Sequence, residues 1–152
     1  MSITLPNNPS QSNAEVGKDF LLYINIGTAS SPTWKAVGGQ RSSNLSRSAE
    51  EIDVSNKTSG GWSAVKAGQR TWNIDLDSLV VSDDDGYQAM NQAFLEGKEI
   101  NILLRNFEDT FAVKGWGSIT DFSLDTPHDD AASISGTISG NGPLEDAIGE
   151  TI

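Results

Sequence analysis

QRTWNIDLDSLVV, residues Gln69 to Val81, alternates apolar and polar side chains along its length. The apolar set is Trp72, Ile74 and Leu76, and the polar set is Thr71, Asn73, Asp75 and Asp77. This alternation predicts a β-strand with one face in a core and the other in water, because successive strand side chains point to opposite faces. A sheet with such a strand needs a second layer to cover its apolar face.

Strand-like segments lie on both sides of this stretch. They are expected over Lys18–Ile26, Thr33–Gln40, Ser42–Ser46, Glu99–Arg105, Phe111–Thr126 and Ala132–Gly140, with Gly115-Trp116-Gly117 interrupting the fifth. Lys18–Ile26 has apolar residues on both faces, which predicts burial on both. The order of strands, one helix and strands predicts a mainly β fold, a sandwich or barrel of mostly antiparallel strands with one flanking α-helix.

The one helix is expected between Ser82 and Gly97. Ser82 is the expected N-cap, with Asp85 three residues later, and Gly97 is the expected first residue past the helix. Side chains at helical spacing are expected to close the core; they are Tyr87, Met90, Phe94 and Leu95. The strand residues expected beneath them are Trp72, Ile74, Leu76, Ile100, Ile102, Leu104, Phe122 and Leu124.

The chain of 152 residues has the length of one domain. Residues 1–17 are rich in Asn, Ser and Pro and are expected to form a flexible arm. Residues 18–140 form the predicted β domain, and residues 141–152 are a Gly- and acid-rich tail.

Residues Arg47 to Gly68, RSAEEIDVSNKTSGGWSAVKAG, interrupt the strand pattern. They show neither strand alternation nor a helical stripe, so a long inter-strand loop is expected over 47–68. Connections in compact domains usually take about four to six residues, and longer ones are commonly functional.

Composition and charge exclude several classes of function. There is no Cys, which removes disulfides, thiolate metal sites and Cys nucleophiles. The net charge is −11, and no Lys or Arg follows Lys114, so a basic nucleic-acid interface is not expected. The N-terminus lacks the basic and apolar regions of a signal peptide, which predicts synthesis in the cytoplasm.

No arrangement of residues indicates an enzyme or a cofactor. His128, followed by Asp129 and Asp130, suggests a surface turn more than a metal site, because three adjacent residues do not easily face one ion. Asp83-Asp84-Asp85-Gly86 lacks the spaced ligands of a calcium loop. Motifs for phosphate loops, dinucleotides and hydrolase nucleophiles are absent from the sequence, so neither a catalytic residue nor a cofactor is expected.

The polar faces of three predicted strands contain no Lys or Arg. They are Asn73, Asp75 and Asp77; Asp121, Ser123 and Asp125; and Ser133, Ser135, Thr137 and Ser139. If these strands pair, the sheet has an acidic, hydroxyl-rich face that repels nucleic acid within a screening length of about 8 Å. An ordinary acidic surface is the alternative interpretation.

Several short motifs along the chain resemble those of a known protein family. Ile52-Asp53-Val54-Ser55, Lys57, Ser59-Gly60-Gly61-Trp62 and Gly68 resemble the "IDVT…S.GW…G" pattern of phage major tail proteins, the tail tube proteins of long-tailed phages. An opening GKD.LLY, a central DDDGYQAMNQAFLEGKEINILL and a closing GWGSITDFSL…ASISGTISGNGPL follow in the order of that family. The resemblance spans about Gly17 to Leu144, with Ser55 where the pattern has Thr.

This resemblance implies a structural virion protein of the phage tail. Subunits of the family join into hexameric rings that stack into a hollow tube with an acidic lumen. The implied partners are further copies of the chain and the tape measure, distal tail and tail terminator proteins, while DNA passes through the lumen without specific binding. The lumen residues would be Asn73, Asp75, Asp77, Asp121, Ser123 and Asp125, and the Ser133–Ser139 row is a further candidate.

In this interpretation the long loop makes contacts between subunits. The residues predicted to do so are Arg47, Glu50, Glu51, Ile52, Asp53, Val54, Lys57, Gly60, Gly61 and Trp62. Ile52 and Val54 form an apolar patch, the glycines form a hinge, and Trp62 is an aromatic anchor of the kind that dominates interfaces.

Two alternatives remain at this point. A gene transfer agent or secretion-system tube would share the whole fold. A carbohydrate-binding β-sandwich would instead use Trp34, Trp62 and Trp116 to stack on sugars.

Overall fold

The computed structural model describes residues 2–10 and 14–152. These residues form eight β-strands, one α-helix and two short 3₁₀-helices. The strands are β1 (Phe20–Asn25), β2 (Trp34–Ala36), β3 (Gln40–Asp53), β4 (Val65–Leu79), β5 (Ile100–Asn106), β6 (Ala112–Asp125), β7 (Ser133–Gly140) and β8 (Glu145–Asp146). The helices are η1 (Gly17–Asp19), η2 (Lys57–Ser59) and α1 (Asp85–Glu96).

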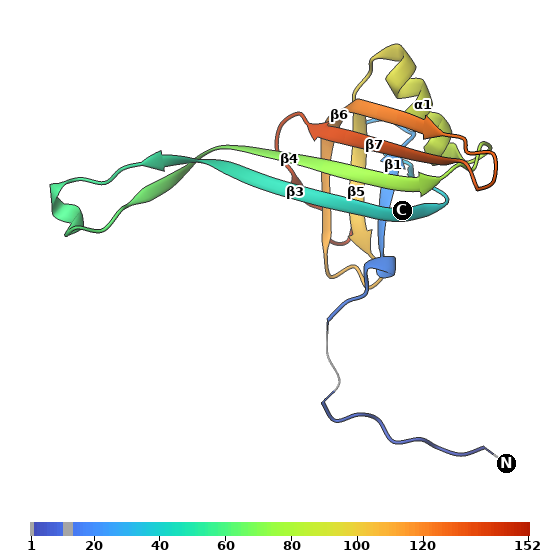
Figure 1. The fold of residues 1–152 in the computed structure, drawn as a ribbon, viewed down its shortest axis with the longest axis horizontal. Coiled ribbons are helices and arrows are strands. Elements are labelled where there is room, and N and C mark those ends of the chain that lie inside the picture. The colour runs from blue at the N-terminus through green and yellow to red at the C-terminus, as the bar shows by residue number, and fades with distance from the viewer. Residues whose placement is uncertain (1, 11–13) are drawn as a thin grey trace.

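All strand pairs are antiparallel, in the order β2-β1-β5-β6-β7-β4-β3, and β8 adds to β6. β6 pairs with β5 up to Gly117 and with β7 from Gly117 onward, so it passes from one layer to the other. Figure 1 shows the two layers crossing, with β1 and β5 behind β3, β4 and β7. The mainly β fold with one flanking helix is therefore as predicted.

Glycines make the passage of β6 between layers possible. A Cβ on Gly117 would lie 2.7 Å from Cγ2 of Ile138, and one on Gly115 would lie 3.0 Å from Cζ2 of Trp72. A Cβ on Gly140 would overlap the Trp72 indole ring itself. The expected interruption at 115–117 is thus not a strand break, but the point at which one continuous strand crosses over Trp72.

The main core lies between the two layers and α1. Its fully buried members include Leu22, Ile24, Ile74, Met90 and Ile102. A smaller cluster of Tyr23, Trp34, Leu103, Ala112 and Ala147 lies on the opposite face of β1 and β5. β1 is buried on both faces, as predicted. Each large aliphatic side chain buried in this way stabilises the fold by about 1.5–3 kcal/mol.

The helix begins two residues later than predicted. Asp84, not Ser82, is the N-cap: its carboxylate accepts hydrogen bonds from the Tyr87 N–H at 3.0 Å and the Gly38 N–H at 2.9 Å. Asp84 is favoured as the cap because the same carboxylate also ties α1 to the segment after β2. Gly97 ends the helix with a φ of 68°, as predicted.

Three predicted core residues, Phe94, Leu95 and Leu124, are exposed, and Tyr87 and Phe122 are half-buried. Met90 and Ala93 face the core, but Phe94 is exposed and Leu95 is 75% exposed. Only the Phe94 ring reaches the body, with its centroid 6.0 Å from that of the Phe122 ring. Leu124 is 59% exposed because β6 extends beyond the helix that covers its neighbour Phe122.

The chain ends behave differently from each other. Residues 2–10 are exposed and form no helix or strand, while part of the predicted arm (Met1 and residues 11–13) lies outside the described residues. The predicted tail, by contrast, packs on the outer layer: Ala147 is buried, and Glu150 accepts from Trp34 Nε1 at 3.3 Å and pairs with Lys114 at 3.2 Å.

Candidate assembly surfaces

The segment Arg47–Gly68 is a β-hairpin arm rather than an irregular loop. β3 and β4 stay paired as far as Asp53 and Val65, and only Val54–Ala64 is free of strand structure. Figure 1 shows the hairpin projecting well beyond the body. The loop prediction was wrong for the paired part because a strand with no core on either side has no apolar alternation to reveal it.

The arm tip, Val54–Ala64, is ordered by short-range polar contacts. Asn56 caps η2 by accepting from the Thr58 N–H at 2.8 Å, and its own N–H donates to Ser59 Oγ at 3.0 Å. Gly60 and Gly61 both take positive φ, 64° and 82°, which reverses the chain at low steric cost. Hydrogen bonds from the Ser55 backbone and hydroxyl lower the pKa of Asp53 at the base of the tip.

The arm's apolar side chains have little to cover them. Trp62 is 82% exposed, and Ile52, Val54 and Val65 are exposed as well. Arg47, Glu50, Glu51 and Lys57 are also exposed, and none forms an ion pair within the described part of the chain. An isolated two-stranded hairpin is only marginally stable in water, so this surface is suited to contact with another molecule.

The three predicted polar faces lie on one surface of the layer β6-β7-β4-β3. Strand register places Asn44, Asp75, Thr137 and Asp121 in one row, and Ser42, Asp77, Ser135 and Ser123 in the next. We call this surface the polar face; its members are Ser42, Asn44, Ser46, Asn73, Asp75, Asp77, Asp121, Ser123, Asp125, Ser133, Ser135, Thr137 and Ser139. It contains no Lys or Arg.

Side-chain hydrogen bonds run along the polar face. Thr137 Oγ1 donates to Asp75 Oδ1 at 2.9 Å, linking β7 to β4. On β6, Ser123 Oγ donates to Asp121 Oδ1 at 3.0 Å. Hydroxyls therefore satisfy carboxylates within and across strands without a basic side chain.

Both edges of this layer lack a strand partner among the described residues. β3 pairs with β4 only, and the second half of β6, from Ser118 to Asp125, pairs with β7 only. Unpaired edges of this length commonly recruit further strands, and natural monomers normally shield them.

The metal-site alternative considered for His128 and its neighbouring aspartates has no support in the described residues. Within residues 2–10 and 14–152 no three His, Asp or Glu side chains gather where they would hold a metal ion. His128 is fully exposed, and its Nε2 lies 3.8 Å from Oδ1 of Asp129. No helix in this part of the chain is long and apolar enough to cross a membrane.

A family model described as phage tail tube protein matches residues 14–146. The chain belongs to the phage tail tube protein family. The predicted resemblance is confirmed, and so are its consequences for fold class and for location in the virion. The family is structural, which points away from an enzyme.

Solved structures agree with this family. The tail of an empty gene transfer agent particle, refined with C6 symmetry, has a TM-score of 0.75 at 26% identity, covering 88% of this chain and 98% of that one. The virion of a native gene transfer agent particle gives 0.74 with the same identity and coverage. The SPP1 tail tube gives 0.70 at 15% identity, covering 86% and 77%, which shows the fold alone. A search of curated proteins found no match.

Three parts of this tail tube protein were not predicted from sequence. The pairing within the arm, the strand β8 and the packing of the C-terminal segment all depend on contacts between distant residues. Asn56 with Ser59 and the Gly60-Gly61 pair were the available signals for an ordered arm tip.

Proposed function

We propose that copies of this chain close into rings through the two open edges of the layer β6-β7-β4-β3, and that the rings stack into the tail tube. The observation that supports this proposal is that both edges of this layer lack a strand partner among the described residues. Four antiparallel strands per copy leave β3 and β6 running in opposite directions, so β3 of one copy continues the antiparallel order beside β6 of the next. Closing a barrel removes every edge.

The number of copies is proposed from the solved relatives. The gene transfer agent tail that is similar to this chain was refined with C6 symmetry, and six copies per ring is the corresponding expectation here. A heterologous contact of this kind, with one edge meeting a different edge, closes into a ring when the rotation per copy is right.

The polar face is proposed to line the lumen. The opposite face of the same layer carries the core, the second layer and α1. The bulk of each copy must therefore lie outside the barrel, which turns the polar face inward. An acidic wall repels phosphates, so DNA would pass without adhering. This assigns Asn73, Asp75, Asp77, Asp121, Ser123 and Asp125 to the lumen, with the Ser133–Ser139 row beside them.

The arm is proposed to join neighbouring copies. Its exposed Ile52, Val54 and Trp62 supply apolar area, and Arg47, Glu50, Glu51 and Lys57 supply charges that fix the register. The further partners, namely tape measure, distal tail and tail terminator proteins, follow from membership of the family and belong to this proposal.

Electron microscopy of the purified chain at high concentration tests the proposal. We expect rings or filaments of uniform bore, with six copies per turn on averaging. A chain that stays monomeric at the highest soluble concentration, in buffers of low and high salt, would contradict it.

A gene transfer agent or secretion-system tube remains the nearest alternative, and a neighbouring tape measure gene would distinguish a phage tail from a secretion ring. The carbohydrate-binding alternative has less support. Trp34 is buried and its indole N–H is bonded to Glu150, Trp62 is at the arm tip, and Trp116 lies on β6. Three side chains placed in this way do not form a sugar-stacking platform.

A further inference from the structure

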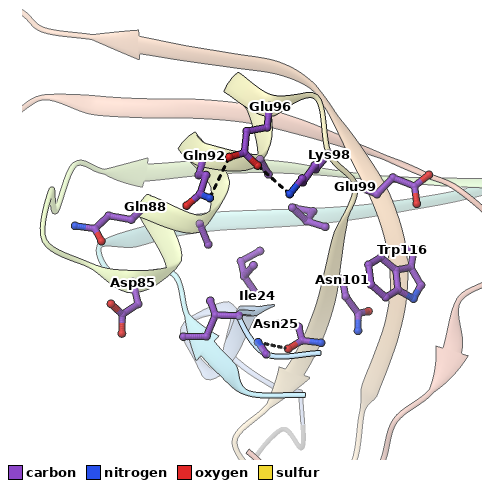
Figure 2. Close-up of a pocket in the computed structure, with 15 residues that line it drawn as sticks. Ile24, Asn25, Asp85, Gln88, Gln92, Glu96, Lys98, Glu99, Asn101 and Trp116 are labelled. Carbon is purple, nitrogen blue, oxygen red and sulfur yellow. Dashed lines mark hydrogen bonds and ion pairs between the residues drawn. The ribbon is translucent and has the colours of Figure 1, made fainter. Parts of the chain in front are cut away.

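A groove of about 470 Å³ lies between α1 and the ends of β1 and β5. Figure 2 shows Gln88, Gln92 and Glu96 of α1 along one side, with Asn101 and Trp116 on the other. Trp116 is 41% exposed, and Ile26, which also lines the groove, is exposed as well. The groove therefore presents two exposed large apolar side chains, Ile26 and Trp116, within a mainly polar lining.

The rim of the groove is acidic. Asp85, Glu96 and Glu99 lie on it, against the single cation Lys98. Lys98 is already paired with Glu96 at 3.2 Å, and Gln92 Nε2 donates to the other oxygen of Glu96 at 3.2 Å. These bonds, the one from Lys98 first, lower the pKa of Glu96 and keep it ionised. Asp85 and Glu99 have no ion-pair partner among the described residues, although Glu99 accepts a hydrogen bond from Asn141 Nδ2 at 2.8 Å, so both carboxylates can attract a positive partner.

The arm has the complementary chemistry. Between Val54 and Lys66 it carries Lys57 and Lys66 and no acid. The same stretch holds Trp62, the most exposed large apolar side chain of the body and arm. Figure 1 shows the arm and α1 at opposite ends of the molecule, so a chain cannot insert its own arm into its own groove. The occupant must come from a second copy.

Ring closure would also direct the arm toward this groove. Residue numbers in β3 rise toward the arm tip. If β3 lies antiparallel to β6 of the next copy, the chain of β3 runs alongside β6 from Asp125 toward Ser118. An arm that follows this edge leaves it at Ser118 and continues toward Trp116, which lines the groove.

We propose that the groove between α1 and the ends of β1 and β5 is the receptor for the arm tip of a neighbouring copy, with Trp62 seated against Trp116. Lys57 and Lys66 lie over the acidic rim. Aromatic anchors in partly desolvated pockets commonly dominate binding energy, while rim charges set specificity and rate. This inference rests on the self-assembly proposed above and names the surface that the arm contacts.

Cross-linking within assembled tubes tests the inference, because the chain has no Cys of its own. The variant Ser63→Cys with Gln92→Cys places one thiol beside Trp62 and one on the groove wall, and leaves Trp62 intact. The matched control is Ser63→Cys with Leu95→Cys, since Leu95 is on the same helix, exposed, and outside the groove. Each is assembled, treated with a short bismaleimide and separated on a denaturing gel.

We expect a ladder of covalently joined chains from the Gln92→Cys variant and mainly single chains from the Leu95→Cys control. Peptide mass spectrometry of differentially labelled mixed tubes should find the thiol introduced at position 63 of one chain joined to the thiol introduced at position 92 of another. Tubes of normal appearance with no ladder, or equal ladders from both variants, would overturn the groove assignment and leave the tube proposal standing. Failure of the unmodified chain to assemble would overturn both.

Discussion

Both halves of β4 pair with β3 in an antiparallel ladder, but they differ in how far their side chains are buried. From Trp72 to Leu79 the side chains alternate between core and polar face, with Ile74 completely buried. From Val65 to Thr71 no side chain is buried, although β4 stays paired with β3, with one register shift between Ala49 and Glu51. The body half is shaped by the chain's own core. The arm half has no core, and in the proposed assembly its apolar residues are covered by another copy.

The largest contrast should appear in the stability of the single chain. Ile74→Ala removes a fully buried side chain and is expected to lower the free energy of unfolding by about 2–5 kcal/mol. Val65→Ala, on the exposed half of the same strand, is expected to change it by less than about 0.5 kcal/mol. Denaturant unfolding of dilute protein measures both changes. Equal losses of unfolding free energy would contradict the view that only the body half of β4 is stabilised by the chain's own core.

The reverse contrast is expected in assembly. Trp62→Ala should leave the fold and the melting temperature unchanged, since the indole is 82% exposed. If Trp62 is worth about 2 kcal/mol at the interface, the concentration needed for tube formation rises about 30-fold. Sedimentation across a concentration series measures it.

Shortening Ser55–Ser63 should have the same effect more strongly, giving folded monomers that do not polymerise. Tubes of normal length from either arm variant at the usual concentration would show that the arm is not an assembly element.

A third test concerns the junction between the two layers. Gly140→Ala places a methyl group into the Trp72 ring and is expected to cost about 1–3 kcal/mol of unfolding free energy. Gly17→Ala is the control, because nothing lies within 4 Å of the added atom and its φ is not positive. No difference between the two would mean that the Trp72 contact is not tight.

The smallest effect on stability and assembly is expected on the polar face. Asp75→Lys together with Asp77→Lys should still give tubes, because neither side chain contributes to the core. If the face lines the lumen, DNA release from virions built with this variant slows, as the new cations hold phosphates. Asp129→Lys with Asp130→Lys, in the exposed turn after β6, makes the same charge change elsewhere. Equal release from both variants would remove the lumen assignment.

Most strands of the body could be predicted because burial on one face produces a period-two pattern in the sequence. Gln69–Val81 predicted the body half of β4 and its polar face, and Glu99–Arg105 predicted β5 to within a residue. Phe94, Leu95 and Leu124 were wrongly placed in the core. Their spacing was right for a core face, but α1 is short and lies over only part of β6, so apolar residues at its end stay outside.

The sequence by itself determined that this chain is a β domain with one helix, an acidic face free of Lys and Arg, and the motifs of a tail tube protein. Those properties reside in local alternation, composition and motif order. Only the tertiary structure decided that Arg47–Gly68 is a paired arm, that three polar strand faces meet on one surface, and that two edges stay open. Strand register and edge exposure come from contacts between residues far apart in the chain, and a one-dimensional pattern does not record which strands will be neighbours.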